Sequence, residues 1–155
     1  MFARLFPKQF DNTYRGHWLG LILFGLLLAL DAVIGTNSIL NTHSVATGAD
    51  GIPLDSYSPS AAREVMLEFA LLGMWRLFFV LIGLVALIRY RAMIPFLFLL
   101  LLIQQLADKA VHALHPTDAD FTAKGLIIVW VMLGVIGAGF VLSLVGKSKP
   151  DNRQA

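Results

Sequence analysis

The sequence predicts an all-α fold: an integral membrane four-helix bundle with both termini on the cytoplasmic side. Two properties predict it, the composition of the chain and four long apolar runs. Of the 155 residues, 57% are hydrophobic and 14% are charged, and the mean hydropathy is +0.74. Soluble domains carry about 25% charged residues, so this chain is too apolar for a typical soluble domain. The composition therefore indicates a protein that lies in a lipid bilayer.

The four apolar runs are long enough to cross a bilayer. They cover residues 18–35, 65–88, 92–103 and 125–146, and the third continues into the polar segment QQLADKAVHALH. A spanning helix needs about 20 mostly apolar residues, and backbone groups in lipid must be hydrogen-bonded internally. Because the runs are continuous rather than alternating, they favour helices over strands. We expect one transmembrane domain, 1–155, with helices at about 17–37, 60–88, 92–114 and 122–146 and a long outer loop at 38–58.

Positively charged residues predict the orientation. Eight of the 12 lysines and arginines fall on one side if the four helices alternate in direction. They are Arg4, Lys8, Arg15, Arg89, Arg91, Lys147, Lys149 and Arg153. The positive-inside rule assigns this side to the cytoplasm. We therefore expect a protein of the plasma (inner) membrane of a prokaryotic cell, with both termini cytoplasmic.

The segment before the first helix is rich in aromatic residues. Phe2, Leu5, Phe6 and Phe10 follow a roughly helical spacing within residues 2–10. This pattern predicts a short amphipathic segment that lies at the membrane interface, anchored by its aromatic face. A disordered tail is the alternative.

Local signals predict helix ends and turns. Ser58 followed by Pro59 predicts an N-cap and the first turn of the second helix. His115, which precedes a proline, predicts the end of the third helix. Between the first two helices, the dipeptide Asp50-Gly51 predicts a turn within the outer loop.

Three of the predicted helices carry polar side chains at the same depth. Asp31 lies about 13 residues after the start of the first helix, and Arg76 lies about 13 residues before the end of the second. At about 1.5 Å per residue, both lie roughly 20 Å from the inner boundary. Gln104 and Gln105 of the third helix come at about the same level. This level is in the outer half of the membrane.

A charge inside a membrane needs a partner, because it costs about 2.5 to 3.5 kcal/mol near the centre of a span. Arginine stays protonated in proteins, so Arg76 needs an acceptor. We expect Asp31 to hold Arg76, with Gln104 or Gln105 and Asp108 as further partners. This buried polar centre has two interpretations. It is either an ion pair that only fixes helix packing, or a site that binds an anion or handles protons.

A second polar group lies at the outer end of the third predicted helix. Asp108, His112 and His115 follow each other at spacings of four and three, which puts them on one side of a helix. Nitrogen and oxygen ligands at such spacing can meet one metal ion. No recognised metal motif is present, and a fourth ligand would have to come from elsewhere. The candidates for that ligand are His43, Glu64 and Glu68.

Small residues in the fourth predicted helix allow another helix to approach closely. Gly134, Ala138, Gly139 and Ser143 therefore predict packing against a helix of this bundle, of a second copy or of another membrane subunit. The lipid bilayer is the other expected partner. No basic cluster of the kind that binds nucleic acid is present.

The sequence requires no cofactor. A metal, a quinone and a pigment remain open as cofactors. Four phenylalanines offer contacts to the ring of a quinone or a pigment, although lipid-facing aromatic residues are also ordinary. They are Phe78, Phe79, Phe96 and Phe98. Because the chain has no cysteine, disulfides, thiol catalysis and thiolate metal sites are excluded.

Two classes of function remain open. The small mass outside the membrane and the lack of a catalytic motif favour an accessory or structural subunit of a larger integral membrane complex, or a homo-oligomer. Because the sequence contains no catalytic motif, it gives no support to an enzymatic activity. The alternative is a small carrier, channel or membrane enzyme, which would use the level of Asp31, Arg76 and Gln104 to bind an anion or handle protons.

Overall fold

Every regular element in the described part of the chain is helical, which confirms the predicted all-α class. The computed structural model describes residues 5–7, 9, 11–115 and 123–146, without the side chains of residues 123 and 124. The long helices are α2 (Trp18–Leu40), α4 (Pro59–Arg89), α5 (Ile94–Leu114) and α6 (Ala123–Leu144). Three short elements join them, α3 (Thr42–Gly48), η1 (Leu54–Ser56) and η2 (Arg91–Met93).

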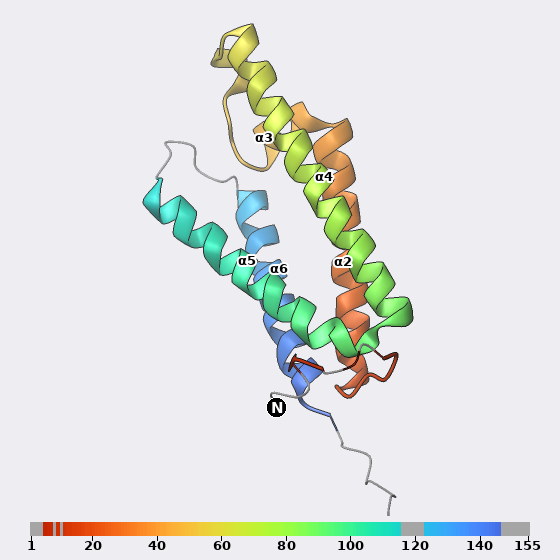
Figure 1. Cartoon of the computed structure of the whole chain (residues 1–155). Helices are drawn as coiled ribbons and strands as arrows, with labels where there is room; N and C mark the ends of the chain where they lie inside the picture. The colour runs from red at the N-terminus through yellow and green to blue at the C-terminus, as the bar shows by residue number, and fades with distance from the viewer. Residues whose placement is uncertain (1–4, 8, 10, 116–122, 147–155) are drawn as a thin grey trace, which may run out of the picture.

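Four helical segments have the length and composition to span a membrane, as predicted. They are Trp18–Leu40, Pro59–Arg89, Arg91–Leu114 and Gly125–Leu144. Because the four helices alternate in direction, α2 begins and α6 ends at the same end of the bundle (Figure 1). We call this end, where Trp18 and Leu144 lie, the terminal end. The opposite end, where Leu40 and Pro59 lie, is the loop end.

The helices follow one another around the bundle in the order α4, α2, α6, α5. α2 packs against both α4 and α6, and α5 packs mainly against α6. Contacts between α5 and α4 are sparse, and α5 leans away from α4 toward the loop end (Figure 1). The bundle is therefore closed on three sides and open on the fourth, between α5 and α4.

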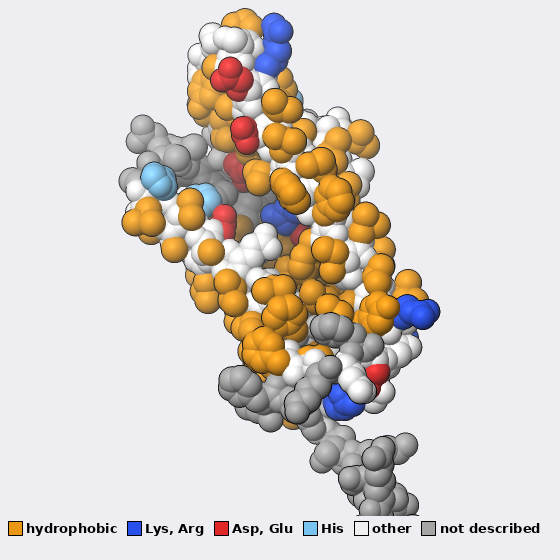
Figure 2. All heavy atoms as spheres, viewed as in Figure 1, with side chains coloured by type: hydrophobic (Ala, Val, Ile, Leu, Met, Phe, Trp, Pro, Cys, Tyr) orange, Lys and Arg blue, Asp and Glu red, His pale blue; other side chains and the backbone are white. Residues whose placement is uncertain are grey.

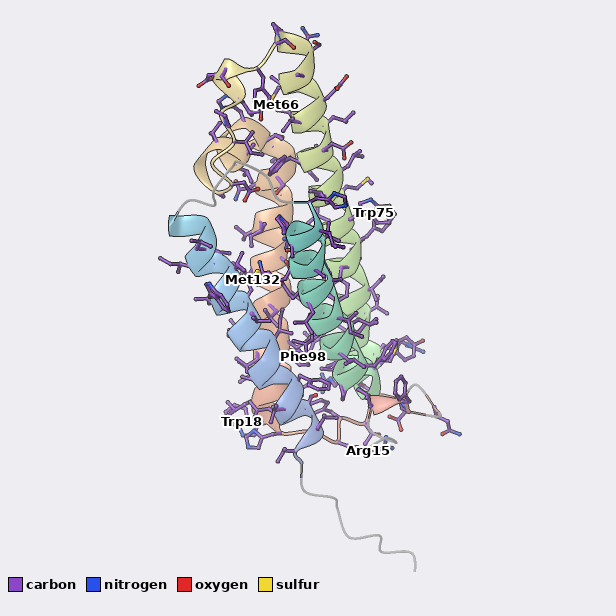
Figure 3. All side chains as sticks on the ribbon, turned by 90° about the vertical axis from the view of Figure 1, so that its left-hand side faces the viewer. Arg15, Trp18, Met66, Trp75, Phe98 and Met132 are labelled. Atoms are coloured by element: carbon purple, nitrogen blue, oxygen red, sulfur yellow. The ribbon has the colours of Figure 1, made fainter. Side chains whose placement is uncertain are left out.

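The hydrophobic core lies toward the terminal end. Its buried members are Phe24, Leu27, Leu28, Ala86, Ile94, Leu97, Phe98, Leu101 and Ile136. Phe98, labelled in Figure 3, meets Phe24 edge to face with 5.3 Å between the ring centroids, a favourable aromatic geometry. All buried residues of α5 lie within residues 94–101. The core therefore holds only the first half of α5.

α2 and α4 approach each other closely at a pair of glycines. A Cβ atom on Gly73 would lie 2.6 Å from the carbonyl oxygen of Gly35, and a Cβ atom on Gly35 would lie 2.9 Å from the carbonyl oxygen of Gly73. No larger residue fits at this distance, so glycine is what permits the contact. Small residues have this role in membrane helix packing generally.

The outer loop predicted at 38–58 is more ordered than the sequence suggests. α2 continues to Leu40, and the loop contains the helical elements α3 and η1. The loop is held by burial of two apolar side chains, Ala46 at 0% and Leu54 at 3% exposure, and by a 3.0 Å hydrogen bond from the Ile52 N–H to the Ala46 carbonyl. Ser58 caps α4 as predicted, since its Oγ accepts a hydrogen bond from the Ala61 N–H.

The segment before α2 is tied to the terminal end. The predicted interfacial segment at 2–10 lies mostly outside the described residues, but the ring of Phe6 is described and lies 5.7 Å from that of Phe96 in α5. Farther along, the His17 N–H donates to the Leu142 carbonyl at 2.9 Å. The predicted end of α5 is confirmed, with His115 as its C-cap.

The glycine crossing generates a stability prediction. We expect Gly73→Ala to lower the free energy of unfolding by about 1–3 kcal/mol, because the new methyl group overlaps the Gly35 carbonyl. The matched control is Gly134→Ala, since nothing lies within 4 Å of a Cβ atom at Gly134. Unfolding in mixed detergent micelles, followed by circular dichroism, measures both. Equal stability of the two variants would contradict the close contact.

Candidate functional site

One ion pair lies among the apolar side chains of the spanning helices. Arg76 of α4 donates from Nη1 to Oδ1 of Asp31 of α2 at 2.7 Å. The Asp31 side chain is 7% exposed, whereas the Arg76 side chain is 36% exposed. The carboxylate is thus enclosed and the guanidinium is open on one side.

The close approach of α2 and α4 positions this pair. Gly35 comes one helical turn after Asp31, and Gly73 comes about one turn before Arg76, so the glycine contact lies next to the ion pair. The two backbones are close at this level because no side chain separates them. Asp31 is short, and this approach brings its carboxylate within reach of the guanidinium.

Arg76 retains hydrogen-bonding capacity beyond the ion pair. A guanidinium carries five N–H donors. Within the described part of the chain, Arg76 donates one hydrogen bond, to Asp31. The other donors form no hydrogen bond with a described residue, and the side chain is 36% exposed. Figure 2 shows a hollow between α5 and α4, with basic, acidic and histidine side chains around it.

Asp50 is a second carboxylate whose charge interacts with that of Arg76. It lies in the turn between α3 and η1. The charges of Arg76, Asp108 and His112 affect its pKa. Partial burial raises the pKa of Asp50 above its ordinary value; Arg76 and His112 act in the opposite direction, and Asp108 acts with burial. The sequence indicated only a turn at this position. No local signal could predict that Asp50 and Arg76 interact, because the interaction depends on how the loop folds.

The polar residues of α5 do not join the ion pair, which corrects the expected polar centre. Among the described residues, neither glutamine nor Asp108 is hydrogen-bonded to Arg76. Gln104 and Asp108 are exposed and Gln105 is half-buried. The reason is that all buried residues of α5 lie within residues 94–101 and the helix leans away from α4 beyond them. Side chains at equal depth in the sequence therefore do not come into contact.

Three of the residues considered for a metal site, Asp108, His112 and His43, have partners within the chain. His112 Nδ1 lies 2.9 Å from the Asp108 carbonyl oxygen of its own helix, and Lys109 Nζ lies 3.9 Å from Oδ2 of Asp108. His43 Nε2 lies 3.4 Å from Oδ1 of Asp55. In the described ranges, no three histidine, aspartate or glutamate side chains are grouped so as to hold a metal ion. Asp108, His112 and His115 therefore gain no support as a metal site, and neither do the possible fourth ligands Glu64 and Glu68.

The small residues of α6 divide between the inside and the outside of the bundle. A Cβ atom on Gly139 would overlap the ring of Phe98, and Ser143 is fully buried, with its Oγ donating to the Phe140 carbonyl at 2.7 Å. Gly134 and Ala138 are exposed instead. Only the second pair is available to a helix outside this chain.

The phenylalanines considered for a ring-shaped cofactor are dispersed. Phe98 is buried in the core, and Phe96 contacts Phe6. Phe78 is exposed and packs against Trp75, which points outward from α4 in Figure 3. These contacts are those of core and surface packing. Comparison with protein-family models, curated proteins and solved structures finds no match to the chain.

The ion pair generates a prediction about folding. We expect Asp31→Ala to lower the free energy of unfolding by about 2–3 kcal/mol, less than for a fully enclosed pair because Arg76 is partly exposed. The double variant Asp31→Leu/Arg76→Leu should recover most of this loss, because no unpaired charge remains. Detergent unfolding measures both, with Asp55→Ala as the control at an exposed aspartate. A fully stable Asp31→Ala variant would refute the structural contribution of the pair.

Proposed function

We propose that this chain is a small integral protein of the plasma (inner) membrane that binds a small anion at Arg76. The observation that carries the proposal is the one-sided openness of the ion pair. Asp31 accepts from one nitrogen of the guanidinium, while 36% of the Arg76 side chain remains exposed. A pair that served packing alone would be expected between closely packed helices on all sides.

The chemistry of arginine supports an anion as the ligand. The guanidinium is planar and always charged, and its parallel N–H groups match the oxygens of a carboxylate or a phosphate. Asp31 fixes its orientation before the ligand arrives, which lowers the entropy that binding has to overcome. Because the Arg76 side chain is only partly exposed, its charge is less screened than in bulk water, which strengthens the attraction to an anion.

The orientation that we propose opens the site to the outside of the cell. Arg15, Arg89 and Arg91 lie at or near the terminal end, and basic loops favour the cytoplasmic side of a membrane. The hollow opens toward the loop end, so under this orientation an anion enters from the external solution. The packed core at the terminal end separates the site from the cytoplasm. This arrangement suits the outward-facing binding step of a carrier.

A test of this proposal compares arginine variants. We expect acetate, methanesulfonate or inorganic phosphate to raise the melting temperature of the purified protein in detergent, and choline chloride, compared with sodium chloride, to leave it unchanged. Arg76→Gln should weaken binding of the effective anion by about 10- to 100-fold, because a charged hydrogen bond contributes about 1.5–3 kcal/mol. Isothermal titration calorimetry measures the affinity.

The matched control is Arg89→Gln at the terminal end, which should bind as the wild type does. If Arg76→Gln alone does not fold, the uncharged double variant Asp31→Asn/Arg76→Gln replaces it and should fold without binding. The proposal fails if none of the three anions binds, or if either Arg76 variant binds with wild-type affinity.

The outer face of α6 supports a second candidate, an accessory subunit or a homo-oligomer. Gly134 and Gly137 have nothing within 4 Å of an added Cβ atom, and the neighbouring Ala138 is exposed. Small residues on an outward face allow a helix of another chain to approach. For this candidate we expect native mass spectrometry in mild detergent to detect an oligomer or a bound subunit, and Gly134→Val/Ala138→Val to dissociate it. A monomer in both proteins would contradict it.

A further inference from the structure

The terminal end of the bundle contains a small cavity between three segments of the chain. The segment before α2 crosses this end, since the Ala92 N–H donates to the Asp11 carbonyl at 3.3 Å and the His17 N–H donates to the Leu142 carbonyl at 2.9 Å. It therefore runs from the start of α5 to the end of α6. The residues that line the cavity, which we call the terminal cavity, include Tyr14, Arg15, Gly16, Arg91, Pro95 and Ser143.

The terminal cavity lies at the depth of lipid headgroups. Its lining residues come from just before the first span, from the start of the third and from the end of the fourth. Trp18 lies at the same end (Figure 3) and is 61% exposed, and tryptophan is typical of the boundary between hydrocarbon and water. Farther along the bordering helices, Leu100 of α5 and Val141 of α6 are exposed apolar side chains. Acyl chains can lie against such surfaces.

Positive charge exceeds negative charge at this end. The described residues place Arg15, Arg89 and Arg91 here, with one carboxylate, that of Asp11. Arg15 and Arg91 line the terminal cavity, whereas Arg89 lines a separate open depression. Arg15 donates to the Asp11 carboxylate at 3.3 Å, and Arg91 donates from Nε to the Leu87 carbonyl at 2.9 Å. A guanidinium has five N–H donors, so each of these two side chains has donors left for an anion.

The hydroxyl of Tyr14 is buried at the wall of the cavity without a partner. A Cβ atom at Gly16 would lie 2.6 Å from this hydroxyl and 2.5 Å from the carbonyl oxygen of Ser143, and all three residues line the cavity. Within the described ranges, no group is hydrogen-bonded to the hydroxyl. Burial raises the pKa of Tyr14 to about 12, so the group keeps its proton and remains a donor. A buried donor without an acceptor is unfavourable, and an anion would supply the acceptor.

We propose that the terminal cavity binds the phosphate group of an anionic phospholipid, with Arg15 and Arg91 donating to its outer oxygens and Tyr14 to the oxygen that enters the cavity. The enclosed space has room for about one group the size of a water molecule, which fits a single phosphate oxygen. A soluble ligand enclosed as a whole would need a pocket on the order of 300 Å³ or more. A lipid needs only its phosphate at the cavity, because its acyl chains stay in the bilayer.

The proposal agrees with how membrane proteins recognise lipids. Basic pockets between spanning helices bind anionic headgroups, and arginine matches the oxygens of a phosphate. The terminal cavity is formed by the crossing segment and the ends of α5 and α6, so a bound lipid would hold these three together. This site does not involve Arg76, and the proposal does not depend on anion binding there.

The experiment counts the lipids bound to the purified protein in a neutral detergent by native mass spectrometry. The probes are dioleoyl phosphatidylglycerol, which is anionic, and dioleoyl phosphatidylcholine, which has the same chains and no net charge. We expect one phosphatidylglycerol to bind at least about tenfold more tightly than phosphatidylcholine, and Arg15→Gln/Arg91→Gln to abolish this preference. Tyr14→Phe should weaken phosphatidylglycerol binding by about tenfold, the loss of one hydrogen bond to a charged group. The stability of the lipid-free protein should not fall in Tyr14→Phe, because the hydroxyl has no partner there.

The matched control is Arg89→Gln, which removes the same charge at the same end without touching the cavity lining. This variant should keep the wild-type preference. An equal loss in Arg89→Gln would overturn the proposal, since surface charge alone would then explain the preference. If Arg15→Gln/Arg91→Gln does not fold, Tyr14→Phe decides, and wild-type affinity in that variant would refute the entry of a phosphate oxygen into the cavity.

Two further measurements identify the ligand and its site. Glycerol 1-phosphate carries the phosphate without acyl chains. If it binds through Arg15 and Arg91 as tightly as phosphatidylglycerol does, the ligand is a soluble phosphate and the lipid assignment is wrong. The uncharged variant Asp31→Asn/Arg76→Gln should retain the lipid, and loss of the lipid there would assign it to Arg76 instead. A wild-type protein that does not distinguish the two phospholipids would also overturn the proposal.

Discussion

The need to pair a guanidinium inside an apolar helix bundle constrains the rest of this structure. Arg76 stays charged, so an acceptor must lie within reach, and Asp31 is that acceptor at 2.7 Å. A short aspartate can reach only if α2 and α4 are close together. Gly35 and Gly73 allow this approach, since a methyl group at either position would meet the opposite backbone. The ion pair and the glycine crossing are thus parts of one arrangement.

The two ends of the bundle differ in packing, and this difference creates the candidate site. At the terminal end, Phe98 fills the space between α2 and α6, where it meets Phe24 and the small residue Gly139. Toward the loop end, α5 has no comparable anchor, and the side between α5 and α4 is open. Arg76, whose side chain is 36% exposed, lies beyond the packed core in this direction. A packed half and an open half in one small bundle suit a protein that receives a ligand from one side, as we propose.

The candidate site could be predicted from the sequence in part. Asp31 and Arg76 could be paired because charges in spans are costly and the two residues lie at equal depth. The same depth argument did not succeed for Gln104, since depth says nothing about whether a helix leans toward its neighbours. Asp50 was missed for a related reason. Its electrostatic interaction with Arg76 depends on how the loop folds, and that loop is held by buried Ala46 and Leu54.

The sequence by itself determined the number of spans, the helix ends at Ser58 and His115 and the two charges that had to meet. These follow from local chemistry: the length of apolar runs, the capping of backbone groups and the cost of an unpaired charge in lipid. Only the tertiary structure decided the tilt of α5, the division of small residues on α6 and the electrostatic interaction of Asp50 with Arg76. Such features arise from contacts between segments far apart in the chain, where side-chain shape rather than local pattern sets which surfaces touch.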